Sequence, residues 1–207
     1  MPHTAKSSLG ALRKFASAAR ERTVVEAERC ELCSLSLPSE HRHLLETLSR
    51  KIVCACDPCA LRFQNVVDGR FKLVPRDARA LSNFQISDAE WEALALPINL
   101  AFFFYSTSSG KMTAMYPSPA GATESELHFE TWSRLVEMNP VLRGLEPDAE
   151  GLIVNRMSDP AAYAIAPIDR CYMLVGLIKA SWEGISGGAG VERAIEAYFD
   201  ELRKVAA

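Results

Sequence analysis

Five of the six cysteines in this chain fall within thirty residues, in two close groups. Cys30 and Cys33 form a Cys-x-x-Cys pair, and Cys54, Cys56 and Cys59 follow after a spacer of 20 residues. Two pairs at this separation are typical of a tetrahedral thiolate metal site. A chain that builds such a site must fold both groups toward one point. The sequence therefore predicts a metal site with four ligands, namely Cys30, Cys33, Cys56 and Cys59.

Three further residues are candidate reserve ligands or neighbours of this site. Cys54 precedes Cys56 by two residues and would point to the same face of a strand, so it could replace Cys56 or remain a buried thiol beside the metal. His41 and His43 would also share a strand face. Either could replace a cysteine, or both could lie at the surface or support the ligands. We expect zinc, with iron in a rubredoxin-like site as the alternative, because the same four thiolates bind either metal.

Composition limits the classes to which the chain can belong. Of its 207 residues, 48% are hydrophobic and 24% are charged, as in ordinary soluble proteins. The net charge of -3 argues against a broad basic surface for nucleic acid. The longest apolar runs, residues 96–105 and 172–178, are shorter than the roughly 18–20 residues needed for a membrane span, so we expect none. Residues 1–20 lack a continuous apolar core, which predicts no secretory signal and a location in the reducing cytoplasm.

The cysteines lie in a segment with the expected order of loop, hairpin and helix. Two short strands are predicted over residues 41–47 and 51–54. Asp57 is a good N-cap and Pro58 suits the first helical position, so a helix should follow the second strand. This order resembles a treble-clef or zinc-ribbon finger, which we assign to residues 25–75.

The rest of the chain divides into an N-terminal helix and a larger domain. Residues 1–24 contain a predicted amphipathic helix over 8–22. A polar connector over 75–83 leads to an α+β domain over 84–207, with a short antiparallel sheet and a C-terminal helix. A capping box at its start, Ser87 to Glu90, signals the first helix. The predicted helices cover residues 88–96, 130–138, 169–179 and 191–205, and the predicted strands cover 98–105, 111–116, 152–154 and 163–166.

Outside the cysteines, no motif names a reaction. Residues 108–111 resemble the end of a phosphate-binding loop but lack its earlier glycine and its helix, so they predict a hairpin turn. Residues 116–126 are predicted to form a long polar loop, and such loops often carry function. An enzyme with a site near residues 116–130 is therefore one alternative, although no nucleophile–base pair is readable there. Its candidate residues are Ser118, Thr123, Glu124, Glu126, His128, Glu130 and Asp169.

Three stretches resemble an uncharacterised bacterial family with an N-terminal four-cysteine finger. They are residues 30–33 with 40–44, residues 116–125, and residues 167–172 through 182–184. The resemblance covers most of the chain from about Cys30 onward. Members are often encoded near nickel–iron hydrogenase genes. The resemblance therefore implies an accessory role in the assembly or function of such a metalloenzyme, with a hydrogenase subunit or maturation factor as the partner. It supplies no catalytic residues.

The combined expectation is a non-catalytic, metal-binding accessory protein that binds a protein partner. A strong structural-metal motif stands beside a domain without a catalytic signature, which favours this class over an enzyme. A rubredoxin-like one-electron carrier, with iron in the same four-cysteine site, is the second hypothesis. The enzyme near residues 116–130 is the third.

Overall fold

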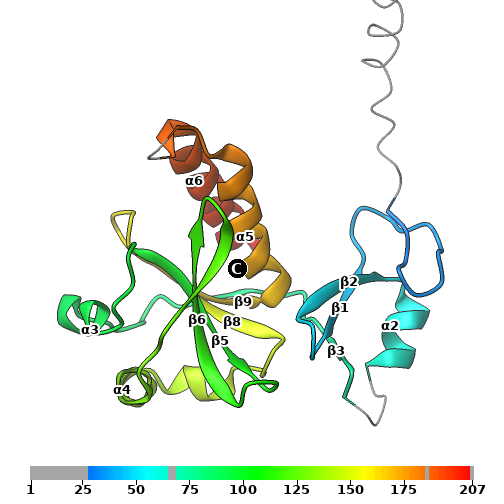
Figure 1. The fold of residues 1–207 in the computed structure, drawn as a ribbon, viewed down its shortest axis with the longest axis horizontal. Helices are drawn as coiled ribbons and strands as arrows, with labels where there is room; N and C mark the ends of the chain where they lie inside the picture. The colour runs from blue at the N-terminus through cyan, green and yellow to red at the C-terminus, as the bar shows by residue number, and fades with distance from the viewer. Residues whose placement is uncertain (1–27, 65–68, 185–186, 206–207) are drawn as a thin grey trace, which may run out of the picture.

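The computed structural model describes residues 28–64, 69–184 and 187–205. It has a mixed α/β fold with antiparallel sheets, and its elements gather into two units that lie side by side (Figure 1). The N-terminal unit contains a three-stranded sheet and a short helix, and the larger unit contains a six-stranded sheet and the remaining helices. The helix predicted over residues 8–22 lies outside the described residues.

The sheet of the N-terminal unit has the strand order β2-β1-β3, and both pairs are antiparallel. The strands predicted over residues 41–47 and 51–54 are confirmed as β1 (Arg42–Glu46) and β2 (Lys51–Ala55). β3 (Phe71–Leu73) pairs with the other edge of β1. The hairpin of β1 and β2 thus forms the scaffold to which both cysteine groups attach.

Helix α2 (Asp57–Phe63) follows β2 directly, as the Asp57-Pro58 dipeptide predicts. Its N-cap is Cys56 rather than Asp57, so the predicted cap was wrong by one residue. Proline is tolerated in the first turn because the N–H groups there have no partner within the helix, and it therefore does not select a single cap residue. As a result, Cys56 lies at the junction of strand and helix, and Cys59 lies in the first turn.

A small core holds the N-terminal unit together. Leu44 of β1 is fully buried and pairs in register with Val53 of β2. Ala60 of α2 packs into the same buried cluster, together with Cys30 and Cys56. Because this cluster contains few large apolar side chains, packing alone supplies limited stability to the unit.

The sheet of the larger unit has the order β4-β9-β8-β5-β6-β7 and is antiparallel throughout. It is wider than the short sheet that the sequence predicts, because two additional strands pair with its edges. Its strands are β4 (Arg79–Ala80), β5 (Leu100–Ser106), β6 (Lys111–Ser118), β7 (Gly121–Ser125), β8 (Glu150–Asn155) and β9 (Ala162–Pro167).

Both edge strands lie where the sequence predicts no strand. The segment 75–83, expected to be a polar connector, contributes β4, in which Arg79 pairs with Ile165 of β9. The segment 116–126, expected to be a long loop, is instead the end of β6, a tight turn and β7. These predictions failed because proline, glycine and small polar residues have low strand propensity, whereas an edge strand needs hydrogen bonds on one side only.

Strand β5 is buried on both faces, as its apolar run predicts. Leu100, Phe102 and Phe104 contribute to one core, and Ala101 and Phe103 contribute to the other. This division follows the period of two in a strand. The sheet is therefore the middle of three layers.

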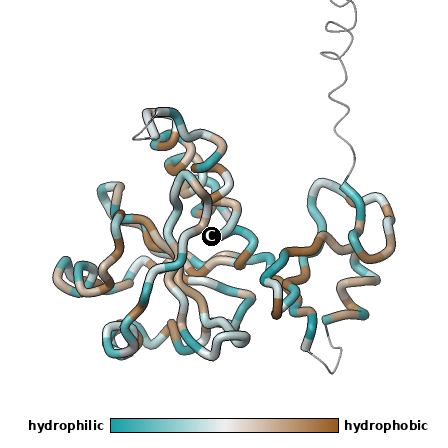
Figure 2. Tube along the Cα trace, viewed as in Figure 1, coloured by the Kyte–Doolittle hydropathy of each residue, from teal (hydrophilic) through white to brown (hydrophobic). Residues whose placement is uncertain are grey.

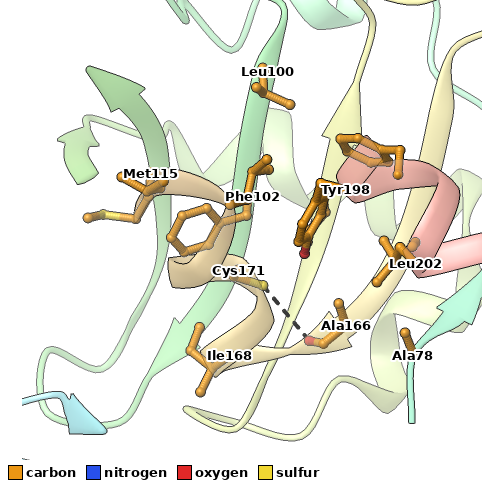
Figure 3. Packing of buried hydrophobic residues seen from close by; sticks show 14 of the residues in the cluster. Ala78, Leu100, Phe102, Met115, Ala166, Ile168, Cys171, Tyr198 and Leu202 are labelled. Atoms are coloured by element: carbon orange, nitrogen blue, oxygen red, sulfur yellow. Dashed lines mark hydrogen bonds between the residues drawn. The ribbon is translucent and has the colours of Figure 1, made fainter. Parts of the chain in front are cut away.

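Helices cover both faces of this sheet. The first face, which carries Phe102, packs against α5 and α6 (Figure 3), as the sequence predicts for residues 169–179 and 191–205. The second face packs against α3, α4 and η1. Figure 2 shows hydrophobic segments along the strands of both sheets. The bounds are α3 (Asp88–Glu92), α4 (Phe129–Met138), the 3-10 helix η1 (Pro140–Gly144), α5 (Ile168–Ser181) and α6 (Gly188–Val205).

Two local predictions in the larger unit are confirmed by hydrogen bonds. The Ser87 hydroxyl accepts from the Glu90 N–H, and the Glu90 carboxylate accepts from the Ser87 N–H, which is the predicted capping box. The turn predicted at residues 108–111 is found at 107–110, between β5 and β6, with Gly110 at φ 67°. Among the described helices, none is both long and apolar enough to cross a membrane.

Candidate metal centre

The first cysteine pair lies in a tight loop held by its own backbone. The Cys30 N–H donates to the Leu35 carbonyl at 2.8 Å, and the Ser34 N–H donates to the Cys30 carbonyl at 2.7 Å. Ser34 has φ 65°, in the left-handed region, which allows the chain to reverse immediately after Cys33. The loop therefore presents both cysteines toward the strand hairpin.

Glu31 ties this loop to β2. Its N–H donates to the Cys54 carbonyl at 2.9 Å, and its carboxylate accepts the Cys54 N–H at 3.0 Å. The same carboxylate pairs with Lys51 at the start of β2. The hydrogen bond from Lys51, followed by the one from the Cys54 amide, lowers the pKa of the Glu31 carboxyl. The first loop is thereby held against the strand that leads to Cys56.

The four predicted ligands converge on one point. The sulfurs of Cys30, Cys33, Cys56 and Cys59 all lie within 4.8 Å of one another, and those of Cys33 and Cys56 are 3.6 Å apart. Tetrahedral zinc with Zn–S bonds of about 2.3 Å holds its sulfurs about 3.8 Å apart. All four are free thiols. The four-cysteine cluster, as we call these residues, therefore has nearly the dimensions of a metal site, and zinc and iron both fit it.

The thiols of the four-cysteine cluster differ in pKa. Burial opposes ionisation of Cys30, but hydrogen bonds with the backbone of Cys56, Leu32 and Cys33 outweigh it and lower the Cys30 pKa to about 6. Burial, followed by hydrogen bonds with the other thiols, raises the Cys59 pKa to about 12. The Cys30 thiolate thus forms readily, whereas ionisation of Cys59 is favoured only beside a cation.

The reserve ligands Cys54, His41 and His43 form a separate group. One ligand atom from each lies within 4.8 Å of the others. His43 of β1 faces Cys54 of β2 in the strand register, and the two imidazole rings have centroids 4.8 Å apart. Burial, followed by the charges of Glu28 and Glu31, raises the pKa of the Cys54 thiol. Because β2 ends at Ala55, strand alternation does not extend to Cys56, and Cys54 lies with the histidines instead.

The polar residues considered for an enzymatic site are engaged with different partners. The Thr123 hydroxyl donates to the Ser118 hydroxyl at 2.9 Å across the β6–β7 turn, and Glu124 pairs with Lys111. Asp169 lies at the start of α5 and contacts the N-terminal unit. Glu126, His128 and Glu130 are exposed near the start of α4. Within the described ranges, the carboxylates near this turn join no group of three metal-ligating side chains.

The contact between Asp169 and His43 is a feature that the sequence does not reveal. The Asp169 Oδ2 lies 2.6 Å from the His43 Nδ1, although the two residues are 126 positions apart. The other carboxylate oxygen accepts the Arg170 N–H at 2.7 Å, which orients the group. A cleft of about 750 Å³ opens here between the two units, lined in part by His41, His43 and Asp169. No local pattern could have indicated this pairing.

The fold and the four-cysteine cluster define an α/β protein whose N-terminal unit could bind a metal ion. The chain belongs to the family of unknown function DUF5947, whose model matches residues 29–206. The match begins just before Cys30, so it includes both the cluster and the larger unit, and its extent agrees with the predicted resemblance. The comparisons with curated proteins and with solved structures each found no match.

Proposed function

We propose that the four-cysteine cluster is a structural zinc site in a non-catalytic accessory protein that binds a protein partner. The observation that carries the proposal is the convergence of four thiol sulfurs, from two loops, within 4.8 Å. Four thiolates complete tetrahedral coordination and leave no position for a substrate. Such a closed site stabilises a fold rather than performing chemistry on a ligand.

The small core of the N-terminal unit is consistent with a structural role for the metal. Leu44, Val53 and Ala60 belong to a buried cluster with few large apolar side chains. Small units of this kind commonly need a metal or disulfides for stability. The binding free energy of a structural metal then contributes directly to folding. We propose accordingly that this unit is a treble-clef or zinc-ribbon finger.

Substitution of the ligands tests the structural site. Cys33→Ser and Cys59→Ser should each lower the bound zinc by one equivalent per chain in elemental analysis, and should melt the N-terminal unit at lower temperature. Cys171→Ala is the matched control, because that thiol is buried in the core of the larger unit (Figure 3). Unchanged metal content and unchanged melting in both serine variants would show that the assigned ligands are wrong.

The partner class follows from the family resemblance. The candidate partner is a cytoplasmic metalloenzyme such as a nickel–iron hydrogenase, through one of its subunits or a maturation factor. The hydroxyls of Ser118 and Thr123 are engaged in hydrogen bonds within the β6–β7 turn, which argues against a catalytic role for them. Affinity capture of the tagged full chain should enrich a metalloenzyme subunit. A monomeric protein with no enriched partner would contradict the accessory role.

One observation favours an electron carrier as the second candidate function. Cys33 is exposed while Cys30 and Cys56 are buried, so one edge of the four-cysteine cluster reaches solvent. An iron ion in this site could then exchange an electron with a docked partner. Protein purified anaerobically from iron-replete cells would be red, with thiolate-to-iron charge-transfer absorption. Colourless protein with zinc in the cluster would exclude this function.

A further inference from the structure

A second set of metal-ligating side chains lies at the junction of the two units, apart from the four-cysteine cluster. His41, His43 and Cys54 each place one ligand atom within 4.8 Å of the other two. His43 and Cys54 are held by the β1–β2 ladder, in which they are direct partners. His41 immediately precedes β1, and its ring meets that of His43 at 77°. The sheet therefore fixes two of the three ligands, and the third lies directly before its first strand.

The imidazole of His41 has one nitrogen without a partner. Its side chain is only 5% exposed, and its Nδ1 lies 3.0 Å from the Pro38 carbonyl oxygen, with a Glu28 carboxylate oxygen 3.5 Å away. Both of these oxygens accept hydrogen bonds, so Nδ1 carries a hydrogen. The Nε2 atom is buried and has no hydrogen-bond partner among the described residues. A buried polar atom without a partner is destabilising, and a bound cation would satisfy the Nε2 lone pair.

The imidazole of His43 is oriented for metal binding by a carboxylate of the larger unit. Its Nδ1 lies 2.6 Å from the Asp169 carboxylate of α5, to which it donates. Because Nδ1 carries the hydrogen, the Nε2 atom of His43 carries the lone pair that can bind a metal. Histidines that bind metals commonly donate their other ring N–H to a carboxylate, which fixes the tautomer and strengthens the ligand. Asp169 is therefore a positioning residue for His43.

We infer that His41, His43 and Cys54 form a second metal site, for a divalent cation of the zinc class. Two imidazoles and one thiolate suit borderline cations such as zinc. The Cys54 thiolate and the Asp169 carboxylate together offset the two positive charges of the ion. This site is distinct from the four-cysteine cluster, because the two ligand sets share no residue.

The second site has an open coordination position. It supplies three protein ligands, whereas a tetrahedral ion needs four. The two histidine ligands, together with Asp169, line the cleft of about 750 Å³ between the units, whereas Cys54 does not line it. Three protein ligands with one open position characterise sites where the metal meets water or an exogenous ligand. The fourth position would therefore be left for water or a small ligand, unlike in the cluster with its four thiols.

Zinc stoichiometry in matched variants tests this site. The full chain is stripped with a chelator under anaerobic, reducing conditions, titrated with Zn²⁺ alone, and analysed for bound zinc after gel filtration. The wild type should bind two equivalents, and His41→Ala and Cys54→Ala should each bind one. Asp169→Asn keeps all ligands and should weaken the second equivalent by about 10–100-fold, even if the alanine variants fail to fold. His128→Ala, which changes an exposed histidine, should still bind two.

The same variants separate the two proposals. A single equivalent that Cys33→Ser loses and His41→Ala keeps would overturn the second site and leave the four-cysteine cluster standing. A single equivalent that His41→Ala loses and Cys33→Ser keeps would overturn the four-cysteine cluster as a metal site and leave the second site standing. A second equivalent that His41→Ala and Cys54→Ala both retain would show that the ligands are misassigned. With Co²⁺ as the probe, added azide should change the visible spectrum of the wild type but not that of His41→Ala.

Discussion

The substitution Gly151→Ala should destabilise the larger unit because β8 has no room for a side chain at this position. A Cβ atom there would lie 3.0 Å from the Cys171 Sγ, 3.2 Å from the Phe103 carbonyl oxygen and 3.8 Å from the Phe102 ring. Both of the first two distances are tighter than ordinary Cβ contacts, so the sulfur and the carbonyl would each have to move by a few tenths of an ångström. The carbonyl belongs to the neighbouring strand of the sheet, and Cys171 is a fully buried residue of α5, so neither can move away freely.

The size of the effect is the difference between two terms. Overpacking of a dense core costs about 1–3 kcal/mol. Removing the backbone freedom of glycine from the unfolded chain offsets about 0.4–1 kcal/mol of this cost. We therefore expect Gly151→Ala to lower the free energy of unfolding by about 1–2 kcal/mol, which corresponds to a fall in Tm of about 2–8 °C for a protein of this size.

Thermal and urea denaturation of matched variants measures this difference. Gly176→Ala is the control, because it lies in α5 with no atom within 4 Å of the added Cβ, and alanine should stabilise the helix there by up to about 1 kcal/mol. The double variant Gly151→Ala/Cys171→Ala should be more stable than the sum of its single variants, by about 0.5–3 kcal/mol. A Gly151→Ala protein as stable as the wild type, or strict additivity with Cys171→Ala, would refute the reasoning.

Three further predictions concern the larger unit. Burial raises the pKa of the Cys171 thiol and of the Tyr198 hydroxyl, so both are neutral in the fold. Their contribution to the free energy of unfolding should be fully present below about pH 8.5 and should decline as pH rises further, because the unfolded chain then loses these protons first. In melting curves, Tyr198→Phe should flatten the part of this decline above about pH 10. Ser87→Ala removes the capping box of α3 and should cost about 1 kcal/mol in urea denaturation. Arg79→Ala removes both hydrogen bonds that the buried Glu150 carboxylate accepts from this side chain, at 2.9 and 3.0 Å. The free energy of unfolding in urea should fall by about 1–3 kcal/mol. An unchanged free energy of unfolding would show that the pair is dispensable.

Features set by short stretches of sequence were predictable. The capping box at Ser87 depends on two residues three positions apart, and the burial of β5 on both faces follows from its unbroken apolar run. The convergence of Cys30 and Cys33 with Cys56 and Cys59 was predictable because two closely spaced cysteine pairs are the pattern of a four-thiolate metal site. In each case the physical cause lies in local geometry or in the chemistry of one residue type.

Features that depend on distant partners were not predictable from patterns. The β7 segment has a composition typical of a loop, and it becomes a strand because β6 presents a free edge to it. Likewise β4 forms because β9 lies beside it. The propensities of these residues are weak, so the hydrogen bonds offered by the neighbouring strand decide their conformation.

The sequence by itself indicated which thiols could form a metal cluster, because the spacing of Cys30, Cys33, Cys56 and Cys59 is typical of a four-thiolate site. It left Cys54 either as a replacement for Cys56 or as a spare thiol beside the metal. Only the tertiary structure decided where Cys54 lies, since its neighbours depend on the register of β1 and β2 and on the end of β2. The approach of Asp169 to His43 likewise requires α5 to pack beside the N-terminal unit. Contacts between segments 126 residues apart arise from the packing of whole elements, which no local pattern encodes.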